Sequence, residues 1–253
     1  MEKIRAIRDG LRSGKTSIGS WMQLPHASVA EIMGQAGYEW VAVDMEHGTV
    51  GAHQLPDLFR ALELGGTLPL ARIAQGAPKD CKQALDAGAG GIIVPMIESA
   101  EQLIKVRDTC CWPPAGKRGV GFSRANLFGK HFETYAEEAQ APLLVAMIEH
   151  AAAVEDLPAI LAVDGLDAIL VGPYDLSASM GMTGAFDRPE FMAVIERILN
   201  ACNSHGVPCG MHVVMPDAAM LQMRIDQGYR FIAYSIDAVF LNSAAVVPET
   251  RMR

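Results

Sequence analysis

Short apolar runs alternate with longer stretches of helical periodicity along the whole chain. The runs are apolar throughout and are bounded by Gly, Pro or Asp, which is typical of strands buried on both faces. They predict eight strands, at residues 17–23, 40–46, 67–73, 91–96, 143–149, 168–173, 208–214 and 231–237.

The segments between these runs predict helices, most clearly at residues 27–36, 78–87 and 189–205. Each is followed by a glycine that suits the left-handed position after a helix: Gly37, Gly88 and Gly206. Strands that alternate with helices imply parallel strands joined by right-handed crossovers. Eight such units in 253 residues favour one closed (β/α)8 barrel of the α/β class, spanning residues 1–253, over an open sheet.

One stretch, residues 110–129, is irregular and rich in Pro, Gly and Arg. It lies between the fourth and fifth predicted strands. We therefore expect it to serve as an active-site loop of the barrel.

Composition and charge narrow the class of protein. The net charge is -8 with no basic cluster, which argues against a nucleic-acid partner. The five cysteines form no CxxC pair, which argues against a disulfide framework and a thiolate zinc site. The first residues contain no signal-like apolar region, and no apolar run approaches the roughly 20 residues of a membrane span. A cytoplasmic enzyme without a membrane partner is expected.

In a (β/α)8 barrel, chemistry gathers at the carboxyl ends of the strands. Glu149 ends the fifth predicted strand and Asp175 follows the sixth, so the two carboxylates should lie on neighbouring strand ends. Two carboxylates completed by water and substrate oxygens suit Mg²⁺ or Mn²⁺. The alternative is that either acid caps the following helix or forms a salt bridge at the rim.

Further polar residues stand at other strand ends. His47 follows the second strand beside Asp44 and Glu46 and could act as a general base, or could be a loop histidine that caps a helix. Arg72 interrupts an apolar run, so it should face a carboxylate of the substrate or of the protein. His212 ends the seventh strand. Neither GxxxxGK[ST] nor GxGxxG is present, so no nucleotide cofactor is indicated.

Five segments in order resemble the HpcH/HpaI family of class II, metal-dependent pyruvate aldolases. They are VDMEHG (43–48), PLARI (69–73), LDAGAGGIIVPMIESAEQ (85–102), PPAGKRGVG (113–121) and VGPYDLSASMG (171–181). The resemblance runs from about residue 5 to residue 245 and is of the 2,4-dihydroxyhept-2-ene-1,7-dioate and 2-keto-3-deoxy sugar acid type. It implies a (β/α)8 barrel and a homohexamer, a trimer of dimers that exchange a C-terminal helix.

The resemblance also implies roles for individual residues. Glu149 and Asp175 would hold the divalent cation, with Co²⁺, Ni²⁺ or Zn²⁺ as alternatives to Mg²⁺ and Mn²⁺. Arg72 would bind the pyruvate carbonyl or enolate oxygen, and His47 would be the base, acting through a water. The pyruvate carboxylate would bind at one turn, which presents backbone N–H groups to it and consists of Gly172, Pro173, Tyr174 and Asp175.

Asp86 would correspond to the family acid that raises the basicity of this histidine. It lies near the end of a predicted helix that runs away from the active-site face. We therefore expect it to act on His47 of a neighbouring subunit, the alternative being an ordinary surface acid.

Two residues depart from the family pattern. Met147 stands where many members have a glutamine, and Tyr174 stands where they have a small residue. The segment GFSRAN (121–126) also differs, so the identity of the aldehyde cannot be carried over.

The expected reaction is the reversible cleavage of a 4-hydroxy-2-oxo acid to pyruvate and an aldehyde through a metal-stabilised enolate, without a Schiff-base lysine. One alternative is a lyase like the citrate lyase β subunit, acting on a coenzyme A thioester. Another is a non-catalytic barrel that binds oxo acids.

Overall fold

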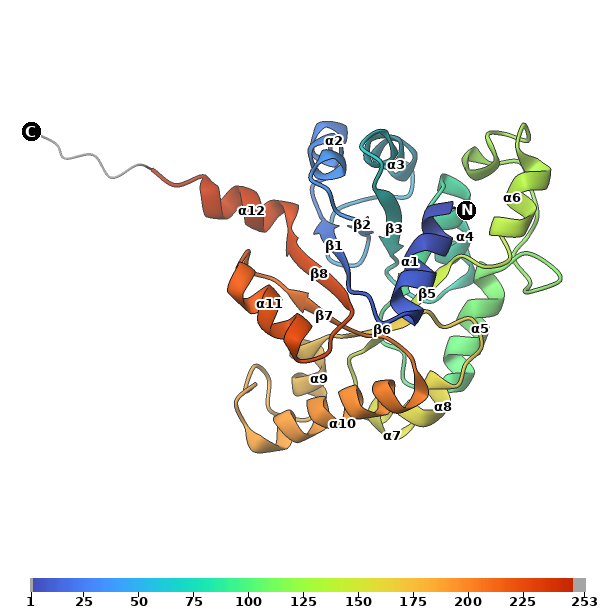
Figure 1. Ribbon diagram of the computed structural model, residues 1–253. Helices are drawn as coiled ribbons and strands as arrows, with labels where there is room; N and C mark the ends of the chain where they lie inside the picture. The colour runs from blue at the N-terminus through green and yellow to red at the C-terminus, as the bar shows by residue number, and fades with distance from the viewer. Residues whose placement is uncertain (1, 248–253) are drawn as a thin grey trace, which may run out of the picture.

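Eight parallel strands close into a barrel in the order β1 to β8, in a computed structural model that describes residues 2–247 (Figure 1). The strands are β1 (Ser17–Met22), β2 (Trp40–Asp44), β3 (Leu68–Arg72), β4 (Gly91–Val94), β5 (Leu143–Ile148), β6 (Ala168–Val171), β7 (Cys209–Val213) and β8 (Phe231–Ile236). The predicted barrel and all eight predicted strands are confirmed. The observed strands end one or two residues earlier than predicted, because the polar residues that follow them turn into the loops.

Helices follow the strands around the outside of the barrel. They are α1 (Glu2–Arg12), α2 (Ala27–Gln35), α3 (Leu55–Leu64), α4 (Pro78–Ala87), α5 (Ala100–Cys110), η1 (Arg124–Asn126), α6 (Phe132–Glu138), α7 (Ala151–Glu155), α8 (Leu157–Leu161), α9 (Pro173–Ser179), α10 (Pro189–His205), α11 (Ala218–Asp226) and α12 (Asp237–Ala244). Helices α4 and α10 have the predicted bounds, and Gly88 and Gly206 after them are left-handed, with φ of 107° and 67°. No helix within residues 2–247 is long and apolar enough to cross a bilayer.

The barrel interior forms a core of its own, separate from the layer between the strands and the outer helices. Trp40 lies inside the barrel and stacks on Phe231 with ring centroids 4.3 Å apart. Its ring fits because residue 19 is glycine: a Cβ there would lie 2.0 Å from the indole. Helix α1 covers the amino end of the barrel, since its Ile4 and Ile7 belong to the same interior core.

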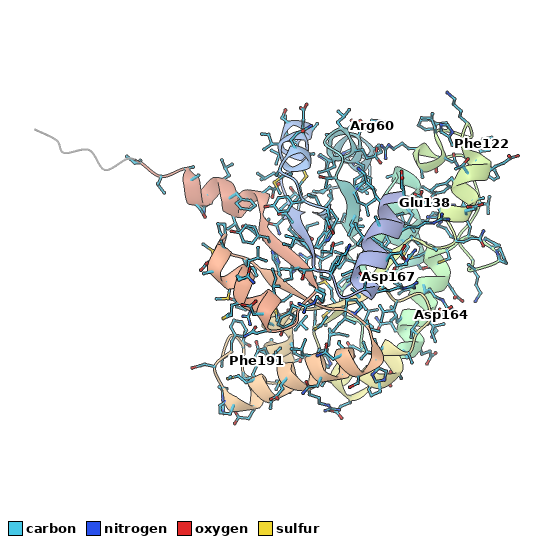
Figure 2. All side chains as sticks on the ribbon, viewed as in Figure 1. Arg60, Phe122, Glu138, Asp164, Asp167 and Phe191 are labelled. Atoms are coloured by element: carbon cyan, nitrogen blue, oxygen red, sulfur yellow. The ribbon has the colours of Figure 1, made fainter. Side chains whose placement is uncertain are left out.

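The prediction for residues 110–129 is wrong for the chain's own barrel. The segment follows α5, and a helix that follows a parallel strand returns the chain to the amino end of the barrel. There Arg124 donates to the backbone oxygen of Ala87 at the end of α4 (3.0 Å), and Trp112 N–H donates to the oxygen of Ala139 (2.8 Å). Figure 2 shows Phe122 of this segment at the outer edge of the molecule, near α6. The prediction failed because a loop between two strands can come either before or after the intervening helix. Only a loop before the helix lies at the carboxyl ends of the strands.

Candidate active site

A buried ion pair joins the ends of β2 and β3. Asp44 and Arg72 are paired in register, and Arg72 donates from Nε and Nη2 to the two oxygens of Asp44 at 2.9 and 2.5 Å. Of the two partners expected for Arg72, the structure shows a carboxylate of the protein. Asp44 is fully buried; burial alone would raise its pKa, but the hydrogen bonds and the charge of Arg72 bring that pKa below its ordinary value. Asp44 is therefore a support that fixes the guanidinium.

Three residues that sequence reasoning did not single out, or left without a role, complete this support. Gln23, just after β1, donates to Asp44 Oδ2 at 2.9 Å. Trp21 lies under Arg72, with the guanidinium carbon 5.2 Å from the ring centroid, and stacks on His212 at 5.2 Å. The polarity of Gln23 at a strand end was a usable signal, whereas Trp21 reads as an ordinary core residue.

Glu149 emerges directly after β5 with its carboxylate nearly enclosed, at 3% exposure. Oε2 accepts a hydrogen bond from the backbone N–H of Met96 at 3.0 Å. The chain passes beside Oε1 at residue 172, where a Cβ would lie 2.3 Å from this oxygen, so glycine is required there. Burial, together with the negative charges of Glu46 and Asp175, raises the pKa of Glu149 to about 7.

Asp175 lies in the first turn of α9, the helix that follows β6, and β6 neighbours β5 in the barrel. It does not cap that helix, whose N-cap is Gly172 without a side-chain hydrogen bond; α7 is capped by His150 instead of Glu149. Within residues 2–247, neither Glu149 nor Asp175 forms a salt bridge. Both alternatives considered for these acids are therefore excluded for the described part of the chain.

The surroundings of Glu149 fit a divalent cation. Glu46 and Asp175 place two further negative charges near it. Within the described residues, no three or more His, Cys, Asp or Glu side chains are arranged so that they alone could hold a metal ion. Mg²⁺ and Mn²⁺ characteristically take one or two carboxylates and complete their coordination with water and substrate. The site therefore fits such an ion and not a fully protein-ligated structural metal.

His47 and Glu46 form the loop after β2. The N–H groups of both residues donate to Asp44 Oδ1, at 3.2 and 3.1 Å. The Glu46 carboxylate lies 3.1 Å from Arg72 Nη1, and His47 is exposed at the mouth. His47 caps no helix, because the following helix, α3, has Gln54 at its N-cap. The imidazole is thus available to a molecule that enters the barrel.

The other predicted positions fall at different depths. Met147 is buried in the barrel interior beneath Glu149 and packs among apolar side chains. Tyr174 is exposed and its ring packs edge-on against Phe186 at 4.9 Å. Asp86 is half-buried in the last turn of α4, at the end of the helix that points away from the mouth, and is not brought to His47 of the same chain.

Comparisons with known proteins match the whole barrel. The HpcH/HpaI aldolase/citrate lyase family profile covers residues 17–244. A hydroxypyruvate/pyruvate aldolase of Roseobacter denitrificans is 36% identical over 95% of this chain and 94% of its own length. A 4-hydroxy-2-oxovalerate aldolase of Novosphingobium aromaticivorans is also 36% identical, over 93% of this chain and 89% of its own length.

The solved structures agree with these sequence matches. A crystal structure of an HpcH/HpaI aldolase/citrate lyase family protein from Burkholderia cenocepacia J2315 has a TM-score of 0.88 and 31% identity. The match covers 94% of this chain and 95% of that one. The chain belongs to the HpcH/HpaI aldolase/citrate lyase family.

Proposed function

We propose that this class II aldolase reversibly cleaves a 4-hydroxy-2-oxo acid to pyruvate and an aldehyde, with a divalent cation held by Glu149 and Asp175. The observation that carries the proposal is the gathering of carboxylates around Glu149, opposite an arginine fixed by its own buried partner. The cation would supply Lewis-acid polarisation of the oxo group. Mg²⁺ or Mn²⁺ suits the carboxylate donors best.

The protein's own residues would do the remaining work. Arg72 keeps N–H groups beyond those given to Asp44 and would stabilise negative charge on the oxo oxygen as the carbon–carbon bond breaks. The backbone N–H groups of Tyr174 and Asp175 would bind the carboxylate, since Pro173 has no N–H and that of Gly172 donates to the oxygen of Ile148 at 3.2 Å. His47 would take the proton of the 4-hydroxyl group through a water, and Asp86 of a second copy would support its basicity.

A second copy of the chain is also suggested by α12. This helix projects away from the barrel in Figure 1 and exposes Leu241. A groove of about 980 Å³ opens between α10 and α11 and is lined mainly by apolar side chains such as Phe191, Met211 and Met220. Helix α11 has no buried residue, so the groove lacks a cover within the described chain. We propose that α12 of a second copy occupies it, as in a dimer of the proposed hexamer.

Leu241→Glu tests this assembly. The variant should lower the mass measured by light scattering, because a charge would be buried in an apolar groove. Leu64→Glu, at another exposed leucine, on α3, is the matched control and should leave the mass unchanged. An unchanged mass for Leu241→Glu would rule out this contact.

The reaction is tested by exchange of the methyl protons of pyruvate with D₂O, followed by NMR with and without Mg²⁺ or Mn²⁺. Exchange that requires the cation, together with carbon–carbon bond formation when a panel of aldehydes is added, is expected. Borohydride with pyruvate should leave the protein unmodified, since no Schiff base is involved. Trapping by borohydride, or exchange that survives a chelator, would refute the proposed mechanism.

The same measurements separate the two alternatives. A non-catalytic oxo-acid-binding barrel would leave the pyruvate protons unexchanged. A lyase acting on a coenzyme A thioester would cleave a carbon–carbon bond of such a substrate, releasing an oxo acid and a shorter thioester, in preference to cleaving the free acid. The names of the two relatives above support the free oxo acid.

A further inference from the structure

Arg118 is a buried cation at the amino end of the barrel, and the function proposed above gives it no role. It is only 3% exposed and lies between two aromatic rings, with its guanidinium carbon 5.7 Å from the centre of Trp112 and 5.8 Å from that of Tyr135. Nη2 donates to the Tyr135 hydroxyl at 2.9 Å, while Nε and Nη1 have no hydrogen-bond partner. No described carboxylate lies within ion-pair distance of it. A buried arginine left so incompletely paired calls for an explanation.

The contacts of Arg118 lead to the last turn of α4. The Tyr135 hydroxyl that accepts from Arg118 lies 3.5 Å from the backbone oxygen of Leu85. On the other side, Arg124 donates to the backbone oxygen of Ala87 at 3.0 Å and pairs with Glu63. The residues before and after Asp86 are therefore both held by the segment that follows α5.

The charges around Asp86 come from four elements. Lys82 lies on α4 itself, Arg118 on the loop after α5, and the Arg124–Glu63 pair joins η1 to α3. The negative charge of Asp86 also contributes to the raised pKa of Tyr135 in α6. Burial raises the pKa of Asp86, and the charges of Arg118 and then Lys82 oppose that rise. Of these two cations, Arg118 is buried and Lys82 is exposed, so Arg118 is the less screened by solvent.

We propose that Arg118 is a positioning residue for Asp86, holding the last turn of α4 through Tyr135 so that the Asp86 carboxylate can serve His47 of a second copy. This proposal rests on the function proposed above. A purely structural Arg118 would only fasten the segment at residues 111–139 to the barrel. The two roles differ in how activity depends on pH.

The test compares Arg118→Met, Arg118→Lys and Asp86→Asn, alone and combined, in the full-length protein with saturating Mg²⁺. The pH profile of kcat/KM is measured from pH 5 to 9, with light scattering and thermal melting to monitor assembly. Arg118→Met should move the acidic limb to higher pH by at least about half a unit, because Asp86 loses a nearby cation. Its activity should recover at high pH, and Arg118→Lys should restore most of the wild-type profile.

The Asp86→Asn background separates the outcomes. Asp86→Asn should lower kcat/KM by at least about tenfold, and adding Arg118→Met should then change the profile little. A loss by the same factor at every pH, repeated in the Asp86→Asn background, would overturn the role of Arg118 while leaving the proposed function intact. Wild-type activity of Asp86→Asn would instead remove the role proposed for Asp86, and this inference with it. If Arg118→Met does not assemble, Arg118→Gln replaces it, since it is also neutral but can still hydrogen-bond to Tyr135.

Discussion

Buried carboxylates on the two sides of the barrel mouth have pKa values shifted in opposite directions. On the side of β1 to β3, Asp44 is buried but receives hydrogen bonds from Arg72 and Gln23, and its pKa is lowered. On the side of β5 and β6, Glu149 is buried with one backbone hydrogen bond, and its pKa is raised to about 7. We call the first the complete side, because its buried charges are paired within the chain. We call the second the incomplete side, because it holds negative charge that a bound cation would balance. We therefore expect the charges on the side of β1 to β3 to stabilise the fold without a ligand, and those on the side of β5 and β6 to depend on a bound cation.

The largest expected effect comes from breaking the complete side. Arg72→Met leaves Asp44 buried without its cation, and should lower the free energy of unfolding by about 3–5 kcal/mol and abolish activity. Urea unfolding and the aldol assay measure both. Arg60→Met, which removes an exposed pair with Asp57, is the control and should change stability by less than about 0.5 kcal/mol. A stable Arg72→Met protein would show that the Asp44–Arg72 pair is not a required support.

On the incomplete side, removal of a buried charge should raise the stability instead of lowering it. Without added cation at pH 8, Glu149→Gln should be more stable than the wild type by about 1 kcal/mol, because it removes a buried charge but keeps an acceptor for Met96. Mg²⁺ or Mn²⁺ should raise the melting temperature of the wild type by a few degrees, and a chelator should reverse this. Glu149→Gln should lose that response and the activity.

Asp164→Asn is the control for this cation effect. Asp164 lies at the amino end of the barrel, away from the mouth, and is labelled in Figure 2. Its variant should respond to the cation as the wild type does. An equal response in Glu149→Gln would mean that the cation binds elsewhere.

The pH dependence of stability distinguishes His212 of β7, which stacks on Trp21, from Glu149. Burial lowers the pKa of His212 from 6.5 to about 4. The unfolded chain thus takes up a proton as the pH falls through about 6.5, while the folded chain does so only near 4. The stability contributed by neutral His212 is present above pH 6.5 and is lost as the pH falls towards 4. Glu149 has the opposite sign: with its pKa raised to about 7, its contribution is present below pH 4.5 and is lost as the pH rises through 7.

Urea unfolding at pH 7.5 and pH 5 measures this effect. Relative to His212→Gln, the wild type should lose up to about 2 kcal/mol more between the two values. His205→Gln, at an exposed histidine at the end of α10, should behave like the wild type. An identical pH dependence in His212→Gln would exclude this assignment.

The smallest effect is expected at Tyr174, whose ring packs on Phe186 at the surface. Tyr174→Phe should change the free energy of unfolding by less than about 0.5 kcal/mol and keep kcat/KM within about twofold. A tenfold loss in the aldol assay would show that the hydroxyl takes part in the site, which would extend the incomplete side beyond the backbone of this turn.

Much of the barrel was predictable because the strands are short, largely apolar runs with polar residues at or just after their ends. The same logic placed Glu149 beside Asp175 and flagged Arg72, since adjacency in a parallel barrel follows chain order. It left two partners open for Arg72, because strand register was needed to bring Asp44 opposite it.

Apart from Gln23, the parts of the site that were missed have no side-chain signature in the sequence. The N–H of Met96 that binds Glu149 belongs to a backbone with a left-handed φ of 50°, which no pattern at that position announces. Trp21 is indistinguishable from a core residue until Arg72 and His212 are seen against its ring. The irregular segment was assigned to the wrong end of the barrel, because it follows α5 and a helix after a parallel strand returns the chain to the amino end.

The position of helix α1 determines from which side small molecules can reach the strand ends. Because its Ile4 and Ile7 join the side chains that fill the barrel interior, no passage runs along the barrel axis in the described chain. A small molecule can therefore reach the carboxyl ends of the strands only from the mouth, and it must leave by the same side.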